Sequence, residues 1–212
     1  LNYYNIKSGL EIHYDGDLPA RSGMGSSSTF TVGLMRALLE IKKKKLSDVQ
    51  LAKEAIKFEQ KKMGEIVGSQ DQLAASIGGL NKIDFFGKNK ISIKKIKMNK
   101  RINRLENNLI LIYSGIQRTA QYIASSYIKD LTKSKKNYIK KIMQFVDQGH
   151  KILQSGDLDH FGELLHEGWI LKKKLSSNIT NSKINQLYNF AMANGASGGK
   201  LLGAGGGGFL LM

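Results

Sequence analysis

The stretch Pro19-Ala-Arg-Ser-Gly-Met-Gly-Ser-Ser-Ser28 is the most informative part of the sequence. Before it, apolar and polar residues alternate over 10–14, which predicts a half-buried strand. After it, apolar residues recur at helical spacing and predict one buried helical face, made of Phe30, Leu34, Ala37, Leu38 and Ile41. We therefore predict that the fold begins with a strand, a glycine loop and a helix.

This glycine loop has the composition of an anion-binding site. Glycines at 23 and 25 allow positive φ angles and a close approach of the backbone to a ligand. The three serines that follow open a helix, whose free N–H groups and dipole favour anions. A turn capped by serine is the alternative. A Walker A motif is excluded, because no Gly-Lys-Ser/Thr follows.

A second motif, Gly68-Ser-Gln-Asp-Gln72, places Asp71 at the start of a predicted helix that ends at Gly78-Gly79. Taken alone, the carboxylate there is expected to be a simple helix cap. Glu59 precedes Asp71 by 12 residues, on a helix predicted over 51–63. Taken alone, Glu59 is expected to be a solvated helix residue.

The third motif is Lys200-Leu-Leu-Gly-Ala-Gly-Gly-Gly-Gly-Phe209. Four consecutive glycines are unfavourable in a fold unless the backbone must pass very close to a ligand or to another segment of the chain. A flexible linker is the alternative, but apolar runs flank the glycines on both sides. We therefore expect a tightly placed loop.

The remaining pattern indicates an α+β protein with a mixed N-terminal part and a helical C-terminal part. Short apolar segments around 83–85 and 91–93 predict a hairpin, and the run 109–113 predicts a central strand. Beyond residue 120, three apolar stripes at 139–153, 161–175 and 184–191 predict helices.

The composition narrows the classes of function. The 33 Lys and Arg against 17 Asp and Glu give a net charge of +16, but the lysines are spread along the chain and are not interleaved with aromatic residues. Attraction of small anions is therefore favoured over nucleic-acid binding. The absence of cysteine excludes thiol chemistry, and the four histidines lack zinc spacing. No apolar run reaches the roughly 20 residues of a membrane helix.

The three motifs together resemble the GHMP kinases. Pro19-x-x-x-Gly-x-Gly-Ser-Ser-Ser28 resembles the second motif of that family, and Lys200–Phe209 resembles its third. The resemblance implies a two-domain fold, with a ribosomal-protein-like N-terminal domain at 1–104 and a ferredoxin-like C-terminal domain at 105–212. The family's first motif and final strands are absent, so we expect a sequence truncated at both ends.

The resemblance also implies ATP and Mg²⁺ as cofactors, and it assigns roles to residues. Asp71 would accept the proton of the substrate hydroxyl, while Ser27 and Glu59 would hold Mg²⁺. The residues implied to bind the nucleotide are Pro19, Arg21, Gly23, Gly25, Ser26, Ser27 and Ser28. The residues implied to bind the substrate are Gln72, Arg118, Gly205, Gly206 and Gly207.

Within the family, the sequence around the motifs is most similar to that of the heptose kinases. Two segments that carry this similarity are Leu165-His-Glu-Gly-Trp169 and Gly199-Lys-Leu-Leu-Gly-Ala-Gly205. This similarity implies phosphorylation of the anomeric C1 hydroxyl of D-glycero-D-manno-heptose 7-phosphate, giving the 1,7-bisphosphate for GDP-heptose and surface polysaccharide. Arg118 would then bind the 7-phosphate, with a surface arginine as the alternative.

Three other functions stay open. They are a galactokinase- or fucokinase-like sugar kinase, a basic nucleic-acid-binding protein, and a catalytically inactive sensor on the kinase fold. The partners expected are ATP and a sugar phosphate, without nucleic acid or membrane. A cytoplasmic location is expected, and a homodimer is the assembly to consider.

Overall fold

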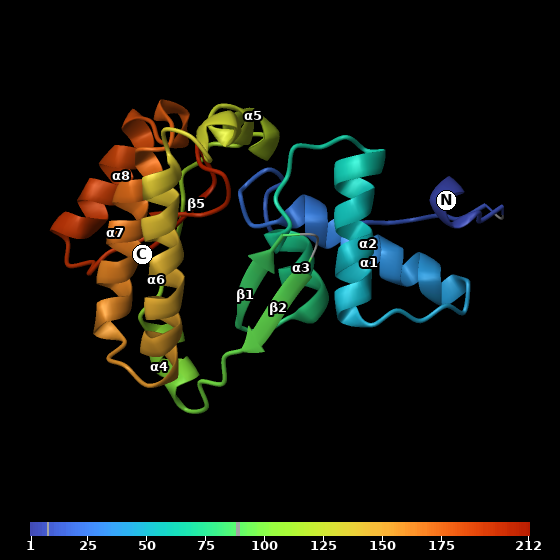
Figure 1. The fold of residues 1–212 in the computed structure, drawn as a ribbon, viewed down its shortest axis with the longest axis horizontal. Helices are drawn as coiled ribbons and strands as arrows, with labels where there is room; N and C mark the ends of the chain where they lie inside the picture. Colours follow the sequence, from blue (N-terminus) through green and yellow to red (C-terminus); the bar gives the residue numbers. More distant parts are fainter. Residues whose placement is uncertain (8, 88–89) are drawn as a thin grey trace. The chain divides into compact units, whose positions relative to one another are not determined.

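The computed structural model of the protein describes residues 1–7, 9–87 and 90–212, and these divide into two compact units (Figure 1). Unit 1 comprises Leu1–Arg21 and Gly25–Gly78, and unit 2 comprises Ser22–Met24 and Gly79–Met212. The division therefore passes through the first glycine loop. The predicted domain boundary at 104/105 lies inside unit 2, and as a boundary between family domains it stays a prediction.

Unit 1 is built from three helices, whose ends follow from local sequence. Helix α1 (Ser26–Ile41) begins directly after Gly25, which has a left-handed φ of 71°. Helix α2 (Asp48–Lys57) begins with a capping box between Ser47 and Gln50, and a π-helical turn, Phe58–Lys62, continues it. Helix α3 (Gln70–Ile77) ends at Gly78, whose φ of 67° is available to glycine at little strain. A short 3-10 turn, Asn2–Tyr4, precedes these helices.

The core of unit 1 lies between α1 and α2, where Val32, Met35 and Leu39 pack with Leu51 and Ala55. The predicted buried face of α1 is largely wrong. Of its five residues only Leu38 is buried, and Phe30 and Ile41 are exposed. Apolar side chains occur on more than one side of this helix, so periodicity alone does not fix the face that packs.

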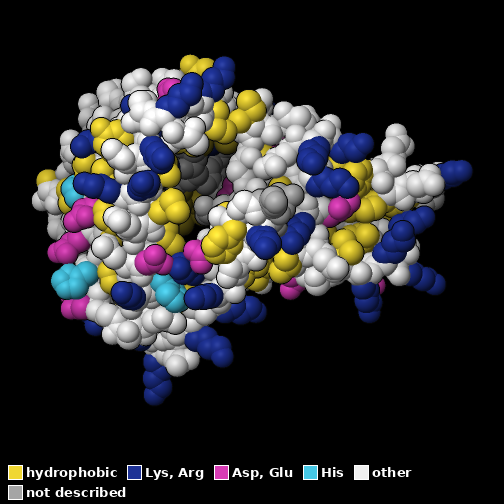
Figure 2. All heavy atoms as spheres, viewed as in Figure 1, with side chains coloured by type: hydrophobic (Ala, Val, Ile, Leu, Met, Phe, Trp, Pro, Cys, Tyr) yellow, Lys and Arg dark blue, Asp and Glu magenta, His cyan; other side chains and the backbone are white. Residues whose placement is uncertain are grey.

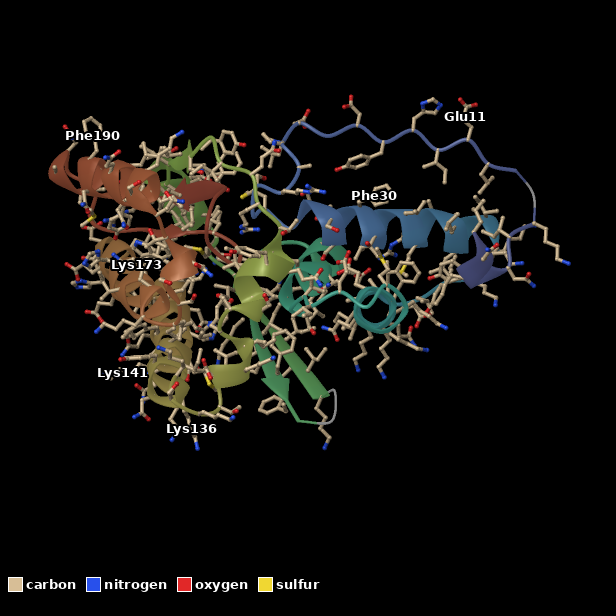
Figure 3. The ribbon with its side chains drawn as sticks, turned by 90° about the horizontal axis from the view of Figure 1, so that it is seen from above. Glu11, Phe30, Lys136, Lys141, Lys173 and Phe190 are labelled. Carbon is tan, nitrogen blue, oxygen red and sulfur yellow. The ribbon has the colours of Figure 1, made fainter. Side chains whose placement is uncertain are left out.

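The strand predicted at 10–14 is also wrong. These residues form an irregular segment that includes Glu11 (Figure 3). Ile12 and Tyr14 in this segment are exposed. A strand needs a neighbour to satisfy its backbone hydrogen bonds, and no described strand pairs with this segment. Tyr14 instead packs edge-on against Phe30, with ring centroids 5.0 Å apart.

Unit 2 contains two small sheets. Strands β1 (Asn81–Phe86) and β2 (Lys90–Lys95) form the predicted antiparallel hairpin, with Ile83 opposite Ile93. Strands β3 (Leu111–Tyr113), β4 (Lys200–Leu201) and β5 (Phe209–Leu211) form an antiparallel sheet in the order β3-β5-β4. The prediction of a central strand at 109–113 is therefore wrong within the described sheet. The central strand is β5, which directly follows the glycine run.

Helices cover the rest of unit 2, and the stripes predicted beyond residue 120 are confirmed as helical. The α-helices are α4 (Arg101–Asn107), α5 (Ala120–Ser125), α6 (Lys136–Gln154), α7 (Asp159–Lys173) and α8 (Ser182–Ala193), with 3-10 turns at Ile128–Asp130 and Ser177–Ile179. Helices α6 and α7 pack side by side (Figure 1). The core centres on Trp169 of α7, which is fully buried with Ile184 and Leu210. Among the described residues, none of the helices has the length and apolarity required to cross a membrane.

Candidate functional site in each unit

A buried carboxylate lies at the centre of the candidate site in unit 1. Glu59 is 1% exposed, and its Oε2 accepts hydrogen bonds from Ser28 Oγ at 3.0 Å and from Gln72 Nε2. Glu59 follows the buried Ala52 and Ala55 at helical spacing, and this spacing could have indicated its burial. The expectation that Glu59, taken alone, is a solvated residue is wrong. Its π-helical turn is a geometry that recurs at functional sites.

The second oxygen of this carboxylate fits a bound cation. Glu59 Oε1 is buried and accepts no hydrogen bond from the described residues, and the same holds for Gln72 Oε1. Burial of a charged oxygen without a partner is strongly unfavourable, and a cation would compensate it. Among the described residues there is no cluster of three or more acidic or histidine side chains for a metal. A metal held by Glu59 would therefore need hydroxyl, phosphate or water oxygens as well, which suits Mg²⁺.

The structure pairs Glu59 with Ser28 rather than with Ser27. Ser28 is buried against the carboxylate, whereas Ser27 is exposed on the first turn of α1. Position 28 is therefore the hydroxyl that fixes Glu59, a contact that motif matching does not identify. The metal role of Ser27 stays a prediction.

Asp71 lies against the start of α1 in the same unit. A Cβ atom added to Gly25 would be 3.2 Å from Asp71 Cγ and 3.4 Å from Asp71 Oδ2. The missing side chain at Gly25 thus allows the carboxylate to approach the N-terminus of α1 closely. Asp71 itself lies in the first turn of α3. A proton acceptor and a helix N-terminus that favours anions are brought together within unit 1.

The glycine run in unit 2 packs against the protein's own chain. An added Cβ would be 1.9 Å from Ser22 O at Gly208, 2.6 Å from Ile116 O at Gly207, and 2.6 Å from Ile123 Cδ1 at Gly206. The N–H of Gly208 also donates to Ile116 O at 2.8 Å. The expectation of a close approach is confirmed, and the approach is to backbone at Gly207 and Gly208 and to a side chain at Gly206. That Gly205, Gly206 and Gly207 line a substrate stays a prediction.

Arg118 lies on this glycine loop. Its Nε donates to Gly205 O, and an added Cβ at Gly23 would be 3.0 Å from Arg118 Nη2. Gly23 has a φ of 82°, which favours glycine, and an added Cβ would also be only 3.1 Å from Leu202 O. Unit 2 therefore holds Gly23, Arg118 and the third motif together.

Three other residues predicted to bind the nucleotide are Pro19, Arg21 and Ser26. Pro19 and Arg21 belong to unit 1; Pro19 is partly buried, and Arg21 is exposed with a φ of 59°. Ser26 is partly buried at the start of α1. Their contacts with a nucleotide stay predictions.

Sequence reasoning missed one residue of the glycine loop's surroundings, Lys172 near the end of α7. Its Nζ donates to Gly203 O at 2.5 Å and to Leu201 O at 3.4 Å. Burial, with the nearby charges of Lys200 and Arg118, lowers the pKa of Lys172 to about 7. Burial also lowers the pKa of Lys200. Lys172 is the first of three consecutive lysines, and only its position three residues after Trp169 distinguishes it in the sequence.

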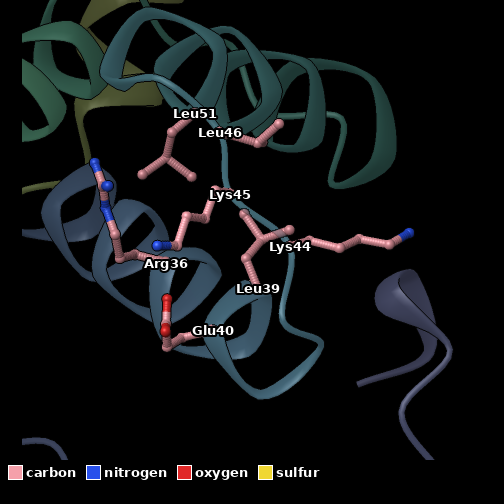
Figure 4. Close-up of a pocket in the computed structure, with 7 residues that line it drawn as sticks. All are labelled: Arg36, Leu39, Glu40, Lys44, Lys45, Leu46 and Leu51. Carbon is pink, nitrogen blue, oxygen red and sulfur yellow. The ribbon is translucent and has the colours of Figure 1, made fainter.

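A pocket of about 190 Å³ in unit 1 is lined by Arg36, Glu40 and Lys45 among others, and includes none of the predicted site residues (Figure 4).

On the face shown in Figure 2, lysine and arginine side chains are dispersed among other types. Lys136 and Lys141 on α6 point away from the helix into solvent (Figure 3). The dispersion matches a general attraction for anions.

Comparisons with known proteins agree with the motifs. Residues 1–79 match the model of the GHMP kinases N terminal domain, and residues 150–212 match that of the GHMP kinases C terminal. The D-glycero-alpha-D-manno-heptose 7-phosphate kinase of Campylobacter jejuni is 31% identical over 203 residues, which cover 95% of this chain and 60% of that protein. The bifunctional fucokinase/GDP-fucose pyrophosphorylase of Arabidopsis thaliana is 26% identical over 97% of this chain and 20% of its own length.

A solved structure shows the same relationship in three dimensions. It is described as a D-glycero-D-manno-heptose 1-phosphate kinase from Bacteroides thetaiotaomicron, and it superposes with a TM-score of 0.70 at 29% identity, covering 92% of this chain and 54% of that chain. The present chain thus spans a little over half the length of this structure and 60% of the Campylobacter relative.

Proposed function

The chain belongs to the GHMP kinases, and from this membership we propose that it transfers the γ-phosphoryl group of ATP to a sugar phosphate. The acceptor proposed is the anomeric C1 hydroxyl of D-glycero-D-manno-heptose 7-phosphate. The observation that carries the proposal is the placement of Asp71 against Gly25 at the N-terminus of α1. The similarity to the Campylobacter heptose kinase supports the choice of sugar.

The residues of unit 1 supply positioning and proton transfer. The N–H groups of Ser26, Ser27 and Ser28 in the first turn of α1 bind phosphate oxygens, as a helix N-terminus does. Asp71 accepts the proton of the acceptor hydroxyl as its oxygen attacks the phosphorus. Phosphoryl transfer depends mainly on alignment and on neutralisation of charge. The N–H groups of α1 align the phosphate oxygens, and Asp71 removes the proton of the attacking hydroxyl.

Glu59 is the carboxylate that would hold Mg²⁺, through its unpartnered Oε1 and with the hydroxyl of Ser27 as the protein's second oxygen. The metal supplies charge neutralisation for the transferred group. Ser28 and Gln72 fix the orientation of Glu59 by sharing its Oε2. Removal of either partner would leave the carboxylate held by a single hydrogen bond.

Arg118 is the residue proposed to bind the phosphate that the acceptor sugar already carries. A guanidinium group pairs with two phosphate oxygens at once, and Arg118 is already held in place by the carbonyl of Gly205. Arg118→Ala is therefore expected to raise KM for heptose 7-phosphate by about 10- to 150-fold and to leave KM for ATP nearly unchanged. A parallel rise of both constants would place Arg118 in the nucleotide site or in folding.

A substrate panel on the full-length enzyme tests the proposal. ADP release is followed with heptose 7-phosphate, mannose, galactose and fucose at equal concentrations. We expect the largest kcat/KM with heptose 7-phosphate. Preference for fucose or galactose would assign the chain to another sugar kinase, an alternative that its identity with the Arabidopsis fucokinase keeps open.

The location and assembly proposed are the cytoplasm and a homodimer. Cell fractionation tests the location, and sedimentation of the purified enzyme tests the dimer. A membrane-bound pool or a monomer at working concentration would contradict the respective proposal.

A further inference from the structure

Two cationic side chains from different parts of unit 2 hold the glycine loop by its carbonyl oxygens. Lys172, on α7, binds the carbonyls of Leu201 and Gly203, and Arg118 binds that of Gly205. A third cation, Lys200, lies in β4 just before the loop and is close enough to lower the pKa of Lys172. The loop is thus surrounded by positive charge along its first half.

Lys172 also sets the direction of one peptide group. In a trans peptide the C=O and the N–H point in opposite directions. Because the Gly203 carbonyl points at the Lys172 ammonium, the N–H of Ala204 points away from it. No hydrogen bond among the described residues uses this N–H. It is therefore a donor that the fold orients and leaves available.

Two of these cations, Lys172 and Lys200, form no ion pair with an acidic side chain within the described structure. Neighbouring buried cations repel one another and lose hydration, which disfavours the charged form of each. An anion bound at the loop would reverse that balance.

We propose that Lys172 is a positioning residue, which holds the Gly203–Ala204 peptide so that the Ala204 N–H donates to a phosphate group of the bound substrate. The proposal rests on the proposed function, because that function makes the glycine loop part of a substrate site. The phosphate belongs either to the acceptor sugar or to the nucleotide. Lys172 acts through the loop and has no direct role in the chemical step.

A pH dependence follows from this arrangement. Lys172 holds the carbonyls best as an ammonium, and the charged groups that act on it are Lys200 on β4 and Arg118 before α5. Since its pKa is about 7, raising the pH from 6.5 to 8.5 discharges Lys172 in the free protein. A phosphate monoester loses its second proton near pH 6, but this change is common to all variants and cancels when they are compared.

The experiment compares Lys172→Met with Lys173→Met in the full-length protein. Lys173 is the matched control, because it is the neighbouring lysine on α7 and its Nζ lies over the Trp169 ring, 5.6 Å from the ring centroid. Binding of heptose 7-phosphate alone, and of the non-hydrolysable analogue AMPPNP alone, is measured by calorimetry at pH 6.5 and pH 8.5. We expect Lys172→Met to weaken one of the two ligands by on the order of tenfold or more at pH 6.5, and by less at pH 8.5. The ligand that is weakened identifies the source of the phosphate.

A second readout needs no ligand. Hydrogen exchange of residues 201–208 is followed in the wild type, Lys172→Met and Lys173→Met, and we expect faster exchange in Lys172→Met at pH 6.5 only. If Lys172→Met fails to fold, Lys172→Gln, which keeps one donor without the charge, takes its place.

The outcomes separate this inference from the proposed function. Unchanged exchange and unchanged affinities in the variant would overturn the positioning role. Equal weakening of both ligands at both pH values would also overturn it, as the sign of a purely structural residue. If neither ligand binds the wild-type protein, the proposed function fails, while the exchange measurement still decides whether Lys172 holds the loop.

Discussion

Asp71 is the residue on which the proposed chemistry depends. Its carboxylate lies against Gly25 at the start of α1, where the acceptor hydroxyl would have to lose its proton. Asp71→Asn keeps the shape of the side chain and removes its basicity. We expect kcat to fall by roughly 10²-fold or more, the usual contribution of a general base, while ATP binding is retained. Steady-state kinetics and nucleotide titration measure the two effects.

Asp15→Asn is the matched control for Asp71, because Asp15 is an exposed residue in the irregular N-terminal segment. Its kinetics should equal those of the wild type. Near-normal turnover in Asp71→Asn would remove the general base from the account and leave Asp71 a role in alignment only.

A second prediction concerns Glu59 and two serines of α1, Ser27 and Ser28. Glu59→Gln and Ser27→Ala should both raise the Mg²⁺ concentration needed for ATP-analogue binding, because Mg²⁺ takes only one or two protein oxygens. Ser28→Ala should instead lower the free energy of unfolding by about 1–3 kcal/mol, since it removes the hydroxyl that donates to buried Glu59. Magnesium titrations and urea unfolding distinguish the two effects. An unchanged Mg²⁺ requirement in Glu59→Gln would exclude Glu59 from the metal site.

The motifs allow Asp71, Gln72 and the glycines to be predicted from the sequence, because each occupies a recognisable position in a loop. The contact between Ser28 and Glu59 is different. It joins residues 31 apart, and it depends on how α1 packs against the end of α2, which no local pattern encodes. Lys172 was missed for the same reason, since its partners lie on β4 and the loop that follows.

At the scale of elements, the glycine run makes a strong prediction about stability. Gly208 has a φ of 98°, and an added Cβ would be 1.9 Å from Ser22 O. Gly208→Ala should therefore lower the free energy of unfolding by about 3–5 kcal/mol, through strain and overlap with backbone. Gly33→Ala is the control, because Gly33 is in α1 and has nothing within 4 Å of an added Cβ.

The two alanine substitutions should change the free energy of unfolding in opposite directions. Gly33→Ala is expected to stabilise the protein by about 0.5–1 kcal/mol, since alanine favours a helix over glycine. Thermal and urea unfolding measure both. A mild effect of Gly208→Ala would mean that the loop can move away from Ser22.

Helices were predicted better than strands, and the reason is physical. A helix satisfies its hydrogen bonds within one segment, so 3.6-residue periodicity and glycine stops suffice to place it. A strand requires a partner. The segment 10–14 alternates like a strand but pairs with no described strand, and the apolar run 109–113 forms an edge strand because β5 pairs on both sides.

At the scale of the whole molecule, Lys172 makes stability depend on pH. Its pKa in the folded protein, about 7, lies below the ordinary value of 10.5, so the unfolded chain binds more protons between these two pH values. The free energy of unfolding should therefore rise with pH in this window, by at most about 1.4 kcal/mol per pH unit. Lys172→Met should show a flatter dependence.

Fluorescence of Trp169 reports this unfolding, because Trp169 is the protein's single tryptophan and is fully buried three residues before Lys172. Urea unfolding at pH 7, 8 and 9 gives the slope for each variant. Equal slopes in the wild type and in Lys172→Met would show that Lys172 titrates at its ordinary value.

The central claim is that the chain directs phosphoryl transfer to the anomeric hydroxyl of a heptose that already carries a phosphate. Phosphorus and proton NMR of the reaction of the full-length enzyme with ATP and heptose 7-phosphate tests it most directly. The account predicts a product with two phosphate resonances, the original one and a new one coupled to the anomeric proton, and it predicts that the new resonance appears roughly 10²-fold or more slowly with Asp71→Asn. A new phosphate coupled to any other sugar proton, or no phosphorylated product at all, would contradict it.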